Sequence, residues 1–102
     1  MSSFDSQIRR NLMGKRLEKE GRILEAKALY EGNISEGFEG SFPYRRLAIL
    51  YRKGKFIDEE IRVLDKAVSV FHNLAGSGRE DVQPKLNDFR ERLEKAKSLK
   101  SR

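Results

Sequence analysis

The chain has 102 residues, of which 37% are charged and 37% are hydrophobic, and its formal net charge is +6. This length accommodates one domain with a well-packed core, and the hydrophobic content is too high for a disordered chain. The sequence has no cysteine, which excludes disulfides, thiolate metal sites and cysteine nucleophiles, and it has no run of roughly 18 apolar residues that would span a membrane.

The first third of the chain predicts a pair of helices. The apolar residues of the first helix share one face: Ile8, Leu12, Met13 and Leu17. Gly21 then interrupts the helical period, and a second apolar stripe runs from Ile23 to Ile34. The glycine-rich segment "EGFEGSFP", residues 36–43, stops this second helix. Two helices joined by a short turn predict a helical hairpin.

The middle of the chain predicts a second hairpin. Ser41 is a candidate N-cap, and Pro43 is tolerated in the first turn of a third helix that runs up to Gly54. Three acidic residues at 58–60 then open a fourth helix, because carboxylates are favoured at the positive end of the helix dipole. The apolar face of the fourth helix comprises Ile61, Val63, Leu64, Ala67, Val68 and Phe71.

A fifth helix is expected after the loop "NLAGSGRED". It begins near Asp81, which places Pro84 in the first turn, where the missing N–H group has little cost. Its apolar stripe comprises Leu86, Phe89, Leu93 and Ala96. Charged residues occupy most other positions, so this helix is amphipathic with a wide solvated face.

The two hairpins repeat with a fixed period. Residues 34 positions apart correspond without a gap, as in the pairs Met13 and Leu47, Leu17 and Tyr51, Ile23 and Ile57, and Tyr30 and Leu64. A 34-residue period that carries a helix–turn–helix unit is typical of the tetratricopeptide repeat.

Residues 8–72 resemble two tetratricopeptide repeats. The large–small pairs at 13–14 and 47–48, the small residue Ala26, and the large residues Tyr30 and Leu64 stand where the family has such residues. Glu60 departs from the pattern, because the family has alanine there. The resemblance implies an all-α fold in which two tetratricopeptide-like hairpins form a right-handed superhelix, closed by the C-terminal amphipathic helix.

We therefore expect five helices in a single domain over residues 1–102. Repeat one would occupy about 7–40, repeat two about 41–74, and the C-terminal capping helix about 81–100. Two repeats are fewer than a helical-repeat protein usually needs, because each unit buries its apolar face only against a neighbour. The last helix would cover one end of the stack, and self-association could cover the other.

The residues that could carry chemistry favour structural roles. His72 is the single histidine and lies at a helix end, where a partly positive side chain suits the dipole. The segment "GSGRED" lacks the Gly-Lys-Ser/Thr ending of a phosphate loop. The acids at 58–60 point in different directions around a helix, which is unsuited to paired acid–base work. We expect no enzyme activity, no metal and no cofactor.

Positive charge concentrates in the third helix. Residues 44–55 carry five cations and no acid, and the first helix is also slightly basic, whereas the second and fourth helices are slightly acidic. In the tetratricopeptide family the first helix of each repeat lines a concave groove, so the resemblance implies a basic groove. Such a groove would favour an acidic peptide or protein as partner.

Five groove positions are candidate peptide-binding residues: Asn11, Lys15, Lys19, Arg45 and Arg52. In the family, Lys, Arg and Asn at such positions can clamp a carboxylate, because fixed donors suit an anionic group. The resemblance thus implies a non-catalytic protein-interaction module or scaffold.

Other functions remain open on the same residues. The cluster Arg45, Arg46, Arg52, Lys53 and Lys55 could bind RNA or DNA through phosphates without sequence specificity. Sequence-specific reading is disfavoured, because the acids at 58–60 would repel the DNA backbone at the start of a recognition helix. A self-associating assembly protein, such as a homodimer, is the third possibility. The lack of cysteine and of an apolar leader favours a cytoplasmic location with no membrane partner.

Overall fold

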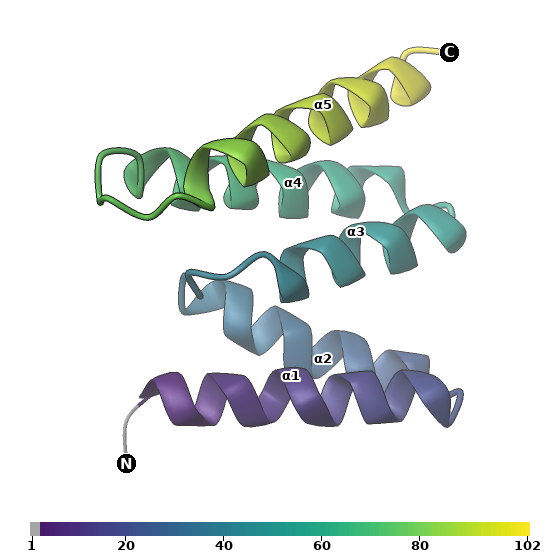
Figure 1. The fold of residues 1–102 in the computed structure, drawn as a ribbon. Helices are drawn as coiled ribbons and strands as arrows, with labels where there is room; N and C mark the ends of the chain where they lie inside the picture. Colours follow the sequence, from purple (N-terminus) through teal and green to yellow (C-terminus); the bar gives the residue numbers. More distant parts are fainter. Residues whose placement is uncertain (1–2) are drawn as a thin grey trace.

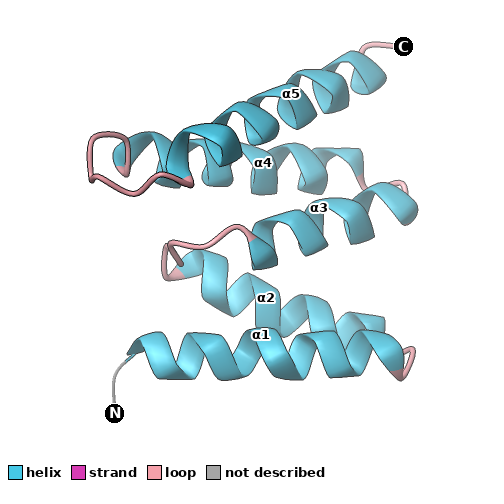
Figure 2. Ribbon diagram, viewed as in Figure 1, coloured by secondary structure: helices cyan, strands magenta, loops and turns pink. Residues whose placement is uncertain are grey.

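A computed structural model describes residues 3–102 of the chain, so Met1 and Ser2 of the expected domain lie outside the described residues. The regular structure in these residues is helical throughout (Figure 2). The helices are α1 (Ser3–Lys19), α2 (Ile23–Ser35), α3 (Phe42–Lys53), α4 (Ile57–Asn73) and α5 (Val82–Lys100). The predicted all-α fold of five helices is confirmed.

Consecutive helices run in opposite directions and each packs against the next (Figure 1). We call α1 with α2 hairpin 1 and α3 with α4 hairpin 2. The odd-numbered helices form one layer and the even-numbered helices lie behind them, with α1 and α5 at opposite ends of the stack (Figure 1). The odd-numbered helices therefore share one side of the molecule (Figure 1).

The turn inside each hairpin is closed in the same way. Gly21 adopts a left-handed conformation with φ of +78°, and the N–H of Arg22 donates to the carbonyl of Leu17. At the equivalent position of hairpin 2 stands Lys55, with φ of +65°. Gly54, the glycine of this turn, is instead in the right-handed region, and a Cβ there would lie 2.8 Å from the Phe56 ring. Lys55 therefore takes a backbone conformation that favours glycine.

The centre of the core lies between α3, α4 and α5. The rings of Tyr44, Phe71 and Phe89, one from each helix, are fully buried and contact one another with centroids 5.5 to 6.5 Å apart. The hydroxyl of Tyr44 donates to the carbonyl of Phe38 at 2.7 Å, so its buried polar atom is satisfied. Burial raises the pKa of this phenol above its ordinary value.

The predicted apolar face of α1 is wrong. The buried residues of α1 are Gln7, Asn11, Gly14 and Leu17. Of the face expected from the sequence, Leu17 is buried and Ile8 is half-buried, whereas Leu12 and Met13 are 64% and 47% exposed. Leu47, the equivalent of Met13 in α3, is fully buried. The difference arises because hairpin 1 lies against α3, whereas α1 ends the stack and no described helix lies beyond it (Figure 1).

Candidate functional site

The candidate site is a cleft of about 540 Å³ bordered by α3, α5 and the first turn of α4. Its lining residues are Ala48, Ile49, Arg52, Lys53, Glu60, Asp88, Glu91, Arg92 and Lys95. The lining residues of α3 come from two consecutive turns, and those of α5 span positions 88 to 95 at spacings of three and four residues, so each helix presents one flank to the cleft. The lining combines two apolar side chains with four cations and three acids.

An ion pair links the α3 and α4 sides of the cleft. Arg52 Nε donates to both carboxylate oxygens of Glu60 at 2.7 and 2.9 Å, and its Nη2 lies 2.6 Å from Oε2. The side chain of Glu60 is only 3% exposed, so this carboxylate depends on Arg52 for compensation of its charge. The hydrogen bonds from the guanidinium to Glu60 raise the pKa of Arg52. Arg52 thus lines the cleft, but its Nε and Nη2 donors are already used by Glu60.

The cations that project from the two helices across this cleft are Lys53 on α3 and Lys95 on α5. Both are exposed, and neither forms an ion pair or hydrogen bond with another residue from 3 to 102, although the charge of Lys53 interacts at longer range with the Glu18 carboxylate of α1. By contrast, Arg92 Nε donates to Asp88 at 2.8 Å within α5. Two ammonium groups from different helices are therefore available to an anionic ligand.

Asn11, predicted as a groove residue, is buried instead. Asn33 Nδ2 donates to Asn11 Oδ1 at 2.7 Å and to the carbonyl of Gln7 at 2.8 Å, and Arg10 Nη1 donates to Asn33 Oδ1 at 3.1 Å. Every polar atom of the Asn33 amide that faces α1 is thus satisfied. The network joins α1 to α2, so the role of Asn11 in this structure is internal.

Lys15 and Lys19 remain exposed on α1 but do not line the cleft. They are the equivalents of Ile49 and Lys53, which do line it, so they lie on the same flank of α1 that α3 presents to the cleft. The helix that stands beside α1 as α5 stands beside α3 is α3 itself, and Arg46 of α3 contacts Glu18 of α1 (Figure 1). Lys15 and Lys19 therefore lie on the α1 side of the neighbouring pair of helices, outside the cleft.

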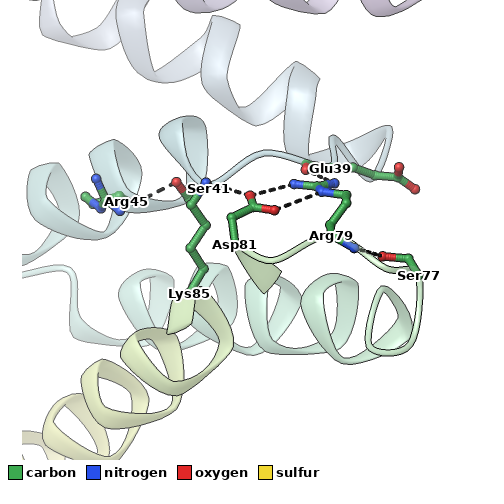
Figure 3. A network of polar contacts seen from close by, with 7 residues as sticks. All are labelled: Glu39, Ser41, Arg45, Ser77, Arg79, Asp81 and Lys85. Atoms are coloured by element: carbon green, nitrogen blue, oxygen red, sulfur yellow. Dashed lines mark hydrogen bonds and ion pairs between the residues drawn. The ribbon is translucent and has the colours of Figure 1, made fainter. Parts of the chain in front are cut away.

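Arg45 is half-buried and poorly partnered. Its Nη2 donates to Ser41 Oγ at a long 3.5 Å, and its buried Nε has no hydrogen-bond partner within residues 3–102 (Figure 3). The equivalents explain this: Arg45 stands where α1 has Asn11, and Ala67 stands where α2 has Asn33. Because Ala67 offers no side-chain acceptor, the contact made in hairpin 1 has no counterpart. Of the five predicted groove residues, only Arg52 lies in the cleft.

The contribution of α5 to the cleft was missed from the sequence. Asp88, Arg92 and Lys95 are spaced i, i+4 and i+7, which places them together on one flank of α5. Such a line of charges beside an apolar stripe is also the usual appearance of a solvated flank. Only the position of α5 beside α3 distinguishes the two.

A second ion pair joins α1 to α3. Arg46 Nε of α3 donates to Glu18 of α1 at 3.1 Å, and the hydroxyl of the buried Tyr30 donates to the same carboxylate at 2.6 Å. Burial alone would raise the pKa of Glu18, but the hydrogen bonds from Arg46 and Tyr30 outweigh it and lower that pKa. Glu18 of hairpin 1 is thus bonded to Arg46 of hairpin 2, and this contact joins the two hairpins.

The entry to α5 is fixed by a polar network (Figure 3). Arg79 Nη1 donates to the carbonyl of Glu39 at 2.9 Å, which links the α4–α5 loop to the α2–α3 loop. Arg79 and Lys85 both contact Asp81, and their hydrogen bonds lower the pKa of this carboxyl below its usual range. The network holds the start of α5 beside α3, and so sets the geometry of the cleft.

A second cleft of about 540 Å³ lies between the start of α1 and the α2–α3 loop. Three of its polar side chains, Gln7, Glu36 and Arg79, are already paired. Gln7 Nε2 donates to Glu36 at 3.1 Å, and Arg79 is held by Asp81 and by the Glu39 carbonyl. The cleft between α3 and α5 is therefore the better candidate.

Within residues 3–102 no cluster of three or more histidine, aspartate or glutamate side chains could hold a metal ion. No helix in the same range is long and apolar enough to cross a membrane. Comparison of the chain with protein-family models, with curated protein sequences and with solved structures found no match. The resemblance to tetratricopeptide repeats therefore stays an interpretation of the sequence.

Proposed function

We propose that this chain is a non-catalytic, tetratricopeptide-like interaction module that binds an acidic peptide segment of a partner protein in the cleft between α3 and α5. The observation that carries the proposal is the pair of exposed ammonium groups, Lys53 and Lys95, which approach the cleft from two helices without an ion pair among the described residues. Charge-assisted hydrogen bonds to carboxylates are about twice as strong as neutral ones.

Except for Glu91, an exposed acid of α5 that no ion pair within residues 3–102 neutralises, the rest of the lining suits the same ligand. Ala48 and Ile49 supply an apolar strip that a small side chain of the peptide can contact. Arg52 neutralises Glu60, so the deepest acid of the cleft does not repel an anionic ligand. Arg52 therefore acts through Glu60, and Lys53 and Lys95 replace it as the residues that contact the carboxylates.

The test is fluorescence anisotropy with a labelled decapeptide rich in Asp and Glu. Lys53→Glu and Lys95→Glu should each weaken binding by about tenfold, which corresponds to about 1.4 kcal/mol and fits the loss of one charged hydrogen bond. Lys66→Glu is the matched control, because Lys66 is an exposed lysine on α4 outside the cleft. It changes the net charge equally and should leave the affinity within about twofold.

Equal weakening by Lys66→Glu would show that net charge, and no particular site, attracts the peptide. Binding of single-stranded RNA or duplex DNA should be measured beside it at two salt concentrations. Nucleic acid bound at physiological salt more tightly than the peptide, with small equal losses for every cation removed, would replace the proposal with phosphate binding.

A further inference from the structure

Three charged side chains of the cleft between α3 and α5 form no ion pair within residues 3–102. Two ion pairs, described above, account for two of the four cations and two of the three acids that line the cleft. The remaining three are Lys53, Lys95 and Glu91, and all of them are exposed. The two lysines suit a ligand that carries carboxylates, but Glu91 would repel a ligand that carries nothing else.

The carboxylate of Glu91 is open to a cation of the ligand. Lys95 follows Glu91 by one turn of α5, yet the two side chains form no ion pair in the described part of the chain. An exposed ion pair at this spacing is weak in any case, so it would withhold neither charge from a ligand. Arg92, the neighbouring cation of α5, already donates to Asp88 at 2.8 Å.

The rise of α5 fixes the spacing of charges in a peptide that runs along it. Glu91 and Lys95 are four residues apart, which is about 6 Å along the helix axis. In an extended peptide, residues two positions apart are separated by about 6.6 Å and point to the same side. Two turns of an α-helix would fill roughly 800 Å³, more than the cleft of about 540 Å³, so an extended segment fits better.

We propose that the cleft is specific for an extended peptide of mixed charge, in which Glu91 pairs with a lysine or arginine two positions from the carboxylate held by Lys95. Lys53, on the opposite helix, takes a second carboxylate of the same segment. This inference rests on the proposed function, because it adds a specificity-determining residue to the same cleft. It contradicts what net charge alone predicts: with +6 on the chain, general attraction would make the most acidic peptide bind best.

The experiment compares three labelled decapeptides by fluorescence anisotropy. The first is acidic but carries one lysine two positions from a glutamate, the second has glutamate in place of that lysine, and the third has the lysine moved by one position. The test variants are Glu91→Gln and Glu91→Lys. The matched control is Glu94→Gln, because Glu94 is an exposed glutamate of α5 that does not line the cleft. Circular dichroism checks that each variant remains folded.

The parent chain should bind the first peptide about fivefold more tightly than the all-acid peptide, which is the upper range for an exposed ion pair. Glu91→Gln should abolish this preference, and Glu91→Lys should reverse it. Glu94→Gln should retain the preference of the parent. The third peptide should lose the gain, because an odd spacing turns its lysine to the other side of the extended chain.

Equal or tighter binding of the all-acid peptide by the parent would overturn the inference, as would the same order of peptides in Glu91→Lys. If Lys53→Glu and Lys95→Glu still weakened every peptide in that case, the proposed function would stand without it. Binding that neither lysine variant weakens, or no binding of any peptide, would overturn the proposed function and the inference together.

Discussion

The residues of hairpin 1 and hairpin 2 correspond at an offset of 34 positions, but the two helices of each hairpin pack against each other differently. In hairpin 1 a Cβ at Gly14 would lie 2.4 Å from the ring of Tyr30, so glycine is required beside this large side chain. In hairpin 2 the same register holds Ala48 and Leu64. Relative to hairpin 1, hairpin 2 has one methyl group more at the position of Gly14 and lacks the aromatic ring at the position of Tyr30. The contact is conserved in volume, which is how cores tolerate exchange of residues.

The polar residues differ more. Hairpin 1 joins its helices with the buried amides of Asn11 and Asn33, whereas hairpin 2 has Arg45 and Ala67 at these places. Hairpin 2 carries its own buried polar contact elsewhere, between Arg52 and Glu60. Hairpin 2 lies between two neighbours and hairpin 1 has one, so hairpin 2 holds the aromatic core. The number of neighbours, more than the repeat pattern, decides how apolar each hairpin becomes.

The largest expected effect separates Leu47 from Met13. Leu47→Ala should lower the free energy of unfolding by about 2–5 kcal/mol, because a fully buried leucine leaves a cavity. Met13→Ala at the equivalent position should change it by less than about 0.5 kcal/mol, because Met13 is exposed. Urea unfolding followed by circular dichroism measures both. Equal losses would mean that the face of α1 around Met13 is covered in solution, and a concentration-dependent midpoint would then identify self-association.

The contact between Gly14 and Tyr30 gives the next effect. Gly14→Ala should destabilise the chain by about 1–3 kcal/mol through overpacking, because Tyr30 is fully buried and its ring cannot move aside freely. Combining it with Tyr30→Leu reproduces the pair found in hairpin 2. The double variant should therefore be more stable than the sum of the two single losses predicts, as a double-mutant cycle measures. Strict additivity would mean that the two positions do not form one contact.

The smallest effect concerns the turns. Lys55→Gly should raise the free energy of unfolding by about 1 kcal/mol, because glycine adopts the left-handed conformation without the strain on a side chain. Gly21→Lys, the reverse exchange at the equivalent turn, should lower it by a similar amount. Thermal melting of both variants measures the pair. If Lys55→Gly were destabilising, the lysine side chain would be making a contact that outweighs its backbone strain.

The sequence alone determined where the helices begin and end. Gly21, the glycine-rich segment at 36–43, Pro43 and the acids at 58–60 are local signals, and the helices of the structure obey them to within a few residues. These signals act through backbone conformation and dipole, which need no distant contact. The turn at 54–55 shows the limit of such reasoning. The left-handed conformation falls on Lys55, the equivalent of Gly21, instead of on Gly54.

The tertiary structure decided which face of each helix is inside and which charges are available. The stripe with Leu12 and Met13 has the same period as a core stripe, yet it is exposed because α2 and α3 lie against the other side of α1 and no described helix covers this face. From the sequence Arg52 looks like a free cation, but in the structure its guanidinium donates to the carboxylate of Glu60, eight residues later. Lys95 joins the cleft only because α5 lies beside α3. The period of the apolar residues and the charge of a side chain can be read from a single helix. Burial and ion pairing depend on two helices, so only the packing of the helices determines them.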